Sequence, residues 1–431
     1  LHDALPILLT SVMDDMRPEN KYLHLMDEQE AITKAQALLN RPGDANVSPL
    51  AVYRRAAKAD SVQQRRPNVV LIMMESMSAE FMKHFGQSET LTPFLDSLYT
   101  RSISFRNFYS AGIHTNHGLY ATLYSFPAMM KRNLMKGSVI PRYSGLPTVL
   151  KENGYYNLFF MTHEGQYDNM NAFFRTNGYD EVFSQEDYPA DKVVNSFGVQ
   201  DDFLYDYAIP VLNQRAATGQ PFFATLLSIS NHPPYVIPPF FHPKTSEPET
   251  QIVEYADWAL RQFFEEARKQ PWFDNTIFVL EGDHGKLVGD AECELPESYN
   301  HIPLMIYSSR IQPEEKTTFG GQVDIQPTIL GLLNIDYLQN NFGVDLLKEE
   351  RPCMFYTADN MVVGRNDTLL YLYNYETQQE LTYDIGNGKL NAVPMDDSFL
   401  PLKEYSFSML QSAEFLVKHG KTLNSIPFTQ Q

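Results

Sequence analysis

Short runs of uninterrupted apolar residues, most of them ending directly at polar residues, recur between residues 68 and 310. The clearest runs are NVVLIMM (68–74), YYNLFFMT (155–162), FFATLLSI (222–229) and TIFVL (276–280). Runs of this length that are rich in β-branched and aromatic residues are typical of strands buried on both faces of a parallel sheet. Helix-like stretches alternate with them, at 91–102, 144–154 and 255–270. The alternation predicts an α/β fold, with a mainly parallel central sheet and helices on both faces.

The pattern differs at the two ends of the chain, which predicts three parts. Residues 1–66 are polar and rich in helix formers, with helices expected at 27–44 and 48–64, and we interpret them as an N-terminal helical connecting arm. Residues 67–350 form the main α/β domain. From Cys353 onward, short runs of alternating apolar and polar residues (MFYTA, NMVVGRN, TLLYLYNY, ELTYDI) predict an antiparallel sheet, and 398–420 predicts a closing helix, so 351–431 is expected to be a small subdomain.

Polar side chains with metal-binding chemistry follow three of the apolar runs. Glu75 follows the first run, His232 lies just beyond the run at 222–229, and Asp283 and His284 follow the last run. In open α/β sheets, ligands bind beyond the carboxyl ends of the strands. Carboxylate oxygen together with imidazole nitrogen suits Zn²⁺ or Mn²⁺. Each feature also has a structural interpretation: Asp283 as a helix cap, His284 as a solvated side chain, and Ser76 or Ser78 as the cap of a helix over SAEFMKHF.

Thr115 stands where a loop meets a predicted helix, LYATLYSF. The N-terminus of a helix presents unpaired backbone N–H groups and the positive end of the helix dipole, which stabilise a phosphate or an attacking alkoxide. A threonine that only caps the helix is the structural alternative. His163 closes the run at 155–162, and His301 precedes the predicted strand LMIY, so both are further polar candidates.

Composition narrows the class of partner. The chain has 431 residues, 43% of them hydrophobic, which is enough for a large packed core. The 34 basic and 53 acidic residues give a net charge of −19, which argues against nucleic acid as a partner because phosphate-backbone binding needs basic surface. A small anionic substrate is still compatible, because a bound dication reverses the local field.

Cysteines and chain ends add three expectations. Cys293 and Cys353 cannot build a disulfide framework or a Cys-rich zinc site, and we expect them to be reduced packing residues, with one bridge between them as the alternative. No run reaches the roughly 18 apolar residues that a membrane-spanning helix needs. The sequence does not begin with Met, and its opening LHDALPI is similar to a translated sequencing adapter, so we expect artefactual first residues and a missing upstream segment.

Eight pieces of the sequence occur in the order of one known family: NVVLIMMES, LTPFLDSL, FRNFYSAGIHTNHG, NGYDEVF, SISNHPPY, EGDHG, HIPLMIY and DIQPTILGLL. The chain thereby resembles the lipoteichoic acid synthase and phosphoglycerol transferase branch of the alkaline phosphatase/sulfatase superfamily. The resemblance covers residues 67 to about 346 and is far more specific than any single motif.

The resemblance implies a set of site residues. Glu75, Thr115, Asp283 and His284 would be the ligands of one divalent ion, Mn²⁺ in the first place, with Zn²⁺ or Mg²⁺ as alternatives. Thr115 would also be the nucleophile, and His232 would contact the substrate phosphate. The chain departs from the family at Asp168–Met170, where relatives that polymerise glycerol phosphate often have a tryptophan and an arginine, so the head group stays open.

The resemblance also implies an activity and a location. A phosphoglycerol transferase would take glycerol phosphate from an anionic phospholipid such as phosphatidylglycerol, hold it on Thr115, and pass it to a glycan or glycerol hydroxyl. It would work at the extracytoplasmic face of the bacterial cytoplasmic membrane, attached through an N-terminal transmembrane segment that this sequence lacks.

Several alternatives follow from the same residues. A phosphoethanolamine transferase and a sulfatase-fold phosphodiesterase or hydrolase are the nearest. A sulfatase would need a cysteine or serine in a C/S-x-P-x-R context, and neither Cys293 nor Cys353 has it. A metal-free binding module is disfavoured by the intact Glu, Thr, Asp and His set.

Overall fold

The computed structural model describes residues 22–48, 51–54, 66–137, 139–386 and 388–423. Contacts gather them into two compact units, each built from separated segments. The first comprises the described residues of 1–60, 111–149 and 319–431, and the second those of 61–110 and 150–318. Each unit is considered by itself, and the three parts predicted along the chain stay a prediction. Among the described residues, no helix is both long enough and apolar enough to cross a membrane.

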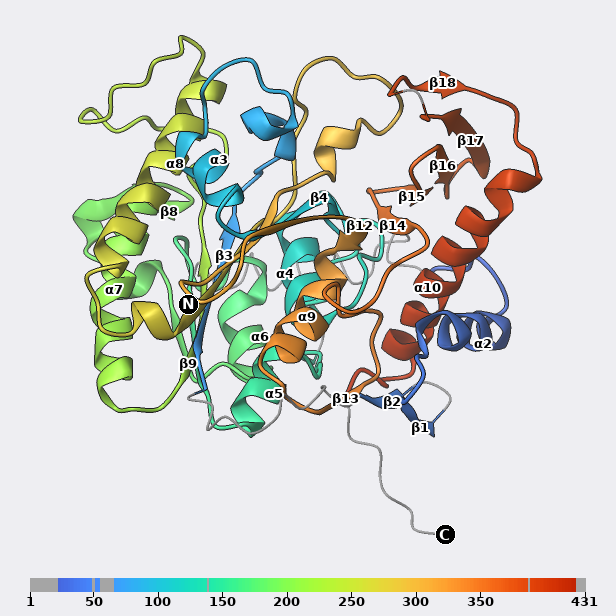
Figure 1. Cartoon of the computed structure of the whole chain (residues 1–431), viewed down its shortest axis with the longest axis horizontal. Helices are drawn as coiled ribbons and strands as arrows, with labels where there is room; N and C mark the ends of the chain where they lie inside the picture. Colours follow the sequence, from blue (N-terminus) through green and yellow to red (C-terminus); the bar gives the residue numbers. More distant parts are fainter. Residues whose placement is uncertain (1–21, 49–50, 55–65, 138, 387, 424–431) are drawn as a thin grey trace, which may run out of the picture. The chain divides into compact units, whose positions relative to one another are not determined.

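An eight-stranded sheet in the order β12-β4-β11-β10-β3-β9-β5-β6 organises the second unit (Figure 1). Its strands are β3 (Asn68–Met74), β4 (Ile103–Tyr109), β5 (Tyr156–Phe160), β6 (Glu181–Phe183), β9 (Phe222–Leu227), β10 (Thr276–Gly282), β11 (Leu304–Tyr307) and β12 (Glu314–Gly321). The five strands from β10 to β6 are parallel, whereas β11 runs antiparallel to β10 and to β4. The predicted mainly parallel sheet is confirmed.

Helices cover both faces of this sheet. Those of the unit are α3 (Pro93–Tyr99), α6 (Met170–Thr176), α7 (Asp201–Ala217) and α8 (Pro248–Ala267), with α5 (Leu146–Glu152) leading into β5. Alternate strand residues such as Val70, Ile72 and Leu280 join one core with residues of α3, α7 and α8. On the opposite face, the Phe159 ring of β5 stacks on Phe174 of α6 at a centroid distance of 4.0 Å. A short hairpin, β7 (Val193–Asn195) and β8 (Gly198–Val199), follows β6.

The first unit contains the predicted antiparallel sheet and closing helix. The sheet is β14 (Met354–Thr357), β15 (Met361–Arg365), β16 (Leu369–Asn374), β17 (Gln379–Asp384) and β18 (Asn391–Ala392), each strand antiparallel to the next. Helix α10 (Leu400–Lys418) packs on it through Phe407, whose ring contacts Tyr371 and Tyr373, and α2 (Glu28–Leu39) packs on α10. The unit also contains helices α4 (Thr115–Tyr124) and α9 (Ile325–Leu332).

The structure differs from the sequence-based expectations at three places. The helix expected at 48–64 is wrong at Ala51–Arg54, which is strand β2, between β1 (Ala45–Ser48) and β13 (Tyr337–Gln339); residues 49–50 and 55–64 lie outside the described residues. Backbone pairing with the distant segment 337–339 decides the conformation of residues 51–54.

The helix expected over SAEFMKHF is two short 3₁₀ turns, and the Ser78 hydroxyl bonds the backbone of Lys286 instead of capping a helix. Helix α7 was not predicted.

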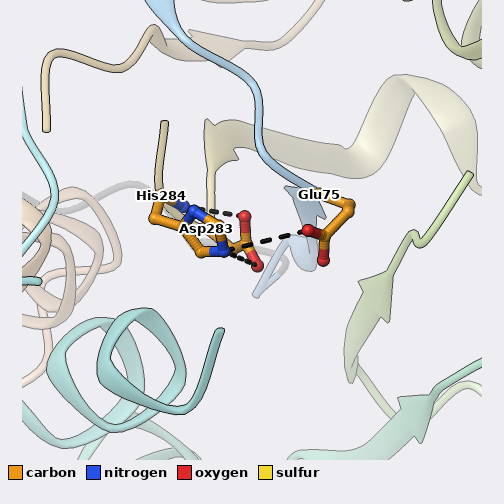
Figure 2. A group of neighbouring side chains, drawn as sticks. All are labelled: Glu75, Asp283 and His284. Atoms are coloured by element: carbon orange, nitrogen blue, oxygen red, sulfur yellow. Dashed lines mark hydrogen bonds and ion pairs between the residues drawn. The ribbon is translucent and has the colours of Figure 1, made fainter. Parts of the chain in front are cut away.

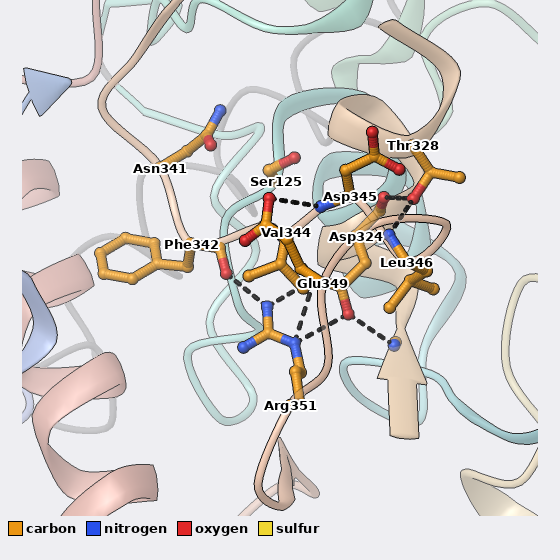
Figure 3. Close-up of polar contacts among 12 residues, drawn as sticks. Ser125, Asp324, Thr328, Asn341, Phe342, Val344, Asp345, Leu346, Glu349 and Arg351 are labelled. Carbon is orange, nitrogen blue, oxygen red and sulfur yellow. Dashed lines mark hydrogen bonds and ion pairs between the residues drawn. The ribbon is translucent and has the colours of Figure 1, made fainter. Parts of the chain in front are cut away.

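A buried ion pair ties the first unit together (Figure 3). The Asp324 carboxylate accepts hydrogen bonds from the backbone amides of Gly321 (2.9 Å) and Val344 (2.8 Å). It also accepts the Arg351 guanidinium, with Nε 2.9 Å from Oδ2, and both side chains are fully buried. Arg351 in turn donates to the Tyr405 hydroxyl on α10 (2.6 Å). The pair therefore joins the start of α9, the 342–346 loop and α10.

We expect Arg351→Met to destabilise the protein by about 3–5 kcal/mol, because it leaves Asp324 buried without its counter-ion. The exposed pair Lys131–Glu376 offers a matched control, and Lys131→Met should cost less than about 1 kcal/mol. Chemical denaturation followed by circular dichroism measures both. Equal losses in the two variants would contradict the structural role given to Asp324 and Arg351.

Candidate functional site

Glu75, Asp283 and His284 come together at the carboxyl ends of β3 and β10 (Figure 2). These strands are parallel neighbours with Met74 opposite Gly282, so the next residues of the two strands emerge side by side. One ligand atom from each of the three side chains lies within 4.8 Å of the other two. His284 Nε2 is 3.8 Å from Glu75 Oε1 and 3.7 Å from Asp283 Oδ2. Within the described residues this is the one such cluster of three or more His, Cys, Asp or Glu side chains.

A strained turn holds Glu75 in place. Ser76 has a φ of 49°, in the left-handed region that residues other than glycine rarely adopt. In that conformation its amide donates to Asp283 Oδ1 (2.8 Å) and its hydroxyl donates to Glu75 Oε1 (2.6 Å). The turn thus fixes the two carboxylates relative to each other. Backbone strain of this kind is typical of functional sites.

The hydrogen bond of His284 at Nδ1 leaves its Nε2 available to bind a metal. Nδ1 lies 2.8 Å from the carbonyl oxygen of Gly285, and because a carbonyl only accepts, Nδ1 carries the proton. The lone pair of the neutral ring is therefore on Nε2, the atom that faces the two carboxylates. Gly285 itself has no room for a side chain, since a Cβ would stand 2.0 Å from the Ser298 carbonyl oxygen.

The electrostatics of the cluster favour a bound cation. Glu75 and Asp283 are almost fully buried, at 1% and 0% exposure. Burial, and then the charge of Asp283, hold the pKa of Glu75 well above its ordinary value. Two buried carboxylates close to each other are an unfavourable arrangement that a divalent ion reverses. The residues present therefore fit a divalent metal ion.

Two further residues at this edge, Asn231 and Lys286, were not predicted as part of the site. Asn231 donates from Nδ2 to the carbonyl oxygens of Glu75 (3.2 Å) and Ser76 (3.0 Å). Its Oδ1 accepts the Lys286 ammonium at 2.6 Å, and Lys286 also donates to the Tyr235 hydroxyl at 3.2 Å. Burial lowers the pKa of Lys286 to about 8. Lys286 directly follows the DHG motif, which is the signal in the sequence that could have identified it.

His163 and His232 lie in loops of the same unit, after β5 and β9. Nδ1 of His232 is 2.6 Å from the carbonyl oxygen of Pro233, which leaves the lone pair on Nε2. Its ring packs on Phe197 at 4.0 Å, while the ring of His163 packs on Tyr167 at 4.7 Å. His163 is buried, and this burial lowers its pKa. Neither histidine joins the cluster of Glu75, Asp283 and His284.

Thr115 is the first residue of α4, at the junction of loop and helix as the sequence predicted. His114 occupies the N-cap position, so Thr115 is not the cap itself. The backbone before it is fixed at Ala111, whose amide donates to Gln322 Oε1 (2.8 Å) and whose carbonyl accepts from the Thr357 amide (2.9 Å). These residues belong to the first unit and the cluster to the second, so membership of Thr115 in the metal site stays a prediction.

Both ring nitrogens of His301 are hydrogen-bonded and so are not available to bind a metal. Its Nδ1 pairs with Glu80 Oε1 and its Nε2 with the carbonyl oxygen of Arg106, each at 2.9 Å. Although burial opposes it, pairing with Glu80 raises the pKa of His301. Both ring nitrogens hold the 79–85 segment against β4, which favours a structural role for His301 over a role as a metal ligand.

We expect His301→Ala to keep one equivalent of metal and to lose about 1–3 kcal/mol of stability, because Glu80 and the Arg106 carbonyl lose their partner. Metal content by elemental analysis and a thermal midpoint are the two measurements. His284→Ala is the comparison and should lose the metal. The opposite result, metal lost from His301→Ala and kept by His284→Ala, would mean that the wrong histidine has been assigned.

Comparisons with known proteins identify the family of this chain. A model of the sulfatase family matches residues 67–335. Lipoteichoic acid synthase 1 of Bacillus subtilis is 25% identical over 350 residues, covering 75% of this chain and 53% of the relative. Lipoteichoic acid synthase of Staphylococcus saprophyticus is 24% identical over 367 residues, covering 77% and 54%. The chain thus spans about half the length of these curated relatives.

Solved structures support the fold. A protein of the alkaline phosphatase superfamily from Vibrio parahaemolyticus superposes with a TM-score of 0.81 and 26% identity, covering 93% of this chain and 98% of the other. The lipoteichoic acid synthase LtaP from Listeria monocytogenes superposes with a TM-score of 0.70 at 21% identity, covering 82% and 92%. The second likeness shows the fold alone.

Proposed function

The chain belongs to the sulfatase family, within the alkaline phosphatase superfamily, and we propose that it is a metal-dependent phosphoglycerol transferase. The observation that carries the proposal is the buried cluster of Glu75, Asp283 and His284, in a chain whose curated relatives are lipoteichoic acid synthases. The family name does not imply sulfate chemistry here, because Cys293 and Cys353 lack the sequence context of a formylglycine precursor.

Glu75, Asp283, His284 and Thr115 would hold the divalent ion, Mn²⁺ in the first place, with Zn²⁺ or Mg²⁺ as alternatives. When bound, the ion would neutralise charge on the phosphoryl oxygens and lower the pKa of a hydroxyl at the site. His284 contributes Nε2, whose lone pair is fixed by the Nδ1 hydrogen bond to Gly285. Ser76 fixes the positions of the two carboxylates through hydrogen bonds from its amide and its hydroxyl.

Thr115 would act as the nucleophile in a two-step transfer. Its Oγ loses its proton and forms a bond to the phosphorus of the lipid while the bond from phosphorus to the diacylglycerol oxygen breaks. That oxygen takes up one proton and leaves as diacylglycerol, so the protons balance. A hydroxyl of the acceptor then loses its proton and attacks the phospho-threonine, the bond from phosphorus to Thr115 Oγ breaks, and Oγ takes up a proton. The N-terminus of α4 favours negative charge at this residue. His232, once protonated at Nε2, would donate a hydrogen bond to the phosphate or give a proton to the leaving oxygen.

The substrates and the place of action follow from the same relatives. The donor would be an anionic phospholipid of the phosphatidylglycerol type, and the acceptor a glycan or glycerol hydroxyl. The domain would work at the extracytoplasmic face of the bacterial cytoplasmic membrane. With a net charge of −19, the chain would be repelled by an anionic bilayer, so attachment through a further segment is the arrangement that we propose.

A diacylglycerol assay tests the substrate. The protein, loaded with Mn²⁺, is incubated separately with detergent-dispersed phosphatidylglycerol, with phosphatidylethanolamine and with a soluble phosphodiester. The proposal predicts diacylglycerol from phosphatidylglycerol. Release from phosphatidylethanolamine alone would replace it with a phosphoethanolamine transferase, and rapid hydrolysis of the soluble diester alone would replace it with a phosphodiesterase.

A further inference from the structure

The turn that joins β14 to β15 in the first unit contacts, at two points, the loop that leads into helix α4. At the first point, the amide of Thr357 donates to the carbonyl oxygen of Ala111 at 2.9 Å. The Thr357 hydroxyl lies 3.4 Å from the same oxygen and 3.3 Å from the carbonyl oxygen of Ala128. Thr357 is fully buried, and hydrogen bonds in such a setting are stronger than in water. The loop is thereby fixed just before Thr115.

The second point lies at the tip of the turn. Asp359 Oδ1 accepts a hydrogen bond from Nε2 of His114 at 2.6 Å. His114 is the N-cap residue of α4, and its carbonyl oxygen accepts the amides of His117 (2.9 Å) and Gly118 (3.2 Å) in the first turn of the helix. A displacement of His114 would therefore displace this turn, in which Thr115 lies.

The loop between these two points is closely packed. A Cβ at Gly112 would stand 2.3 Å from Nδ1 of His117 and 2.9 Å from Cβ of Ala128, so both side chains lie directly on the loop backbone. His117 is fully buried, and its ring contacts that of His114 at a centroid distance of 5.0 Å. The backbone that leads to Thr115 is thus held at both ends and packed in between.

We propose that Thr357 and Asp359 are positioning residues for the transfer: they hold the loop 111–114, and through this loop they set the place of the Thr115 hydroxyl. This inference rests on the proposed function, which gives Thr115 its role as the nucleophile. Positioning matters because the rate of attack depends steeply on the geometry of the reacting atoms, and a displacement of about 1 Å can cost about 100-fold. The small antiparallel sheet thereby gains a function in the reaction, which it exerts through the loop.

Asp359→Ala tests the inference first through the backbone. It removes the acceptor of His114, so the amides of His117 and Gly118 should exchange with deuterium about tenfold faster, as measured by mass spectrometry of the full chain. The amide of Ser125, at the other end of α4, should exchange as in the wild-type protein. The thermal midpoint should stay nearly unchanged, because a half-exposed pair contributes little to stability.

The same variant should lower kcat about tenfold and leave KM unchanged, because the turn acts on the attacking oxygen and not on lipid binding. Steady-state diacylglycerol release from phosphatidylglycerol, at saturating Mn²⁺, measures both values. Thr357→Val keeps the shape and the backbone amide, and should lower kcat by a smaller factor. Asp359→Asn still offers an oxygen to His114 and should restore kcat and deuterium exchange to nearly wild-type values.

Glu376→Ala is the matched control, because Glu376 is an exposed acid between β16 and β17 of the same sheet, pairs with Lys131 and should change neither measurement. Unchanged exchange at His117 and Gly118 in Asp359→Ala would overturn the inference, and so would faster exchange with an unchanged kcat. The exchange measurement needs no turnover. A wild-type protein that releases no diacylglycerol would therefore defeat the proposed function, while the exchange result would still decide whether the turn holds the loop.

Discussion

Thr115→Ala should reduce transfer by a factor on the order of 10⁴ or more while leaving the protein folded, because it removes the oxygen that would both attack the phosphorus and bind the metal. Thr115 lies at the first turn of α4, and its hydroxyl is not the helix cap, so the stability cost should not exceed about 1 kcal/mol. Initial rates of diacylglycerol release measure the effect, and the thermal midpoint confirms the fold.

Thr115→Ser is the matched control for that experiment. It keeps a hydroxyl at the same place and should retain measurable transfer, whereas Thr115→Val, similar in shape but without the oxygen, should behave as Thr115→Ala does. Transfer at the wild-type rate in the alanine variant would remove the covalent mechanism from consideration.

Replacing a carboxylate of the cluster should remove the metal and the activity together. Glu75→Gln and Asp283→Asn keep the shape of each side chain but eliminate one of two buried negative charges. We expect each to bind metal at least about 100-fold more weakly, with a parallel loss of transfer. Equilibrium binding of Mn²⁺ and Zn²⁺ to the metal-free chain provides the measurement.

Glu75→Gln should not weaken the metal-free fold. Burial and the charge of Asp283 raise the pKa of Glu75, so we expect the ionised pair to be unfavourable without a cation. The metal-free Glu75→Gln protein should therefore be at least as stable as the wild type. Glu80→Gln, in the same unit but bonded to His301, is the control and should bind metal normally. Full activity in Glu75→Gln or Asp283→Asn would show that the cluster is not the metal site.

The strands of the central sheet could be predicted because each is recognisable from its own run of apolar residues. β3 and β10 are apolar at nearly every position and buried on both faces, a pattern that amphipathic helices do not show. Helix α7 was missed because Pro210 lies inside it, although the two acidic residues at its start are a helix-start signal that could have identified it. Strand β2 depends on a partner, Tyr337–Gln339, far along the chain.

The cluster of Glu75, Asp283 and His284 was predictable for a similar reason. Each residue directly follows a buried strand, and parallel strands end at the same edge of a sheet. The sequence could not show that β3 and β10 are immediate neighbours in register, which is what brings the carboxylates together. Lys286 was missed because its role comes from Asn231 and Tyr235, more than fifty residues earlier in the chain, and no local pattern encodes that contact.

The most direct test of the account is mass spectrometry of the protein after incubation with phosphatidylglycerol and Mn²⁺ in the absence of an acceptor. We predict a mass increase of one glycerol phosphate group, located on the peptide that contains Thr115 and absent from Thr115→Ala. Diacylglycerol release with no modification of Thr115, or modification at another residue, would contradict the account.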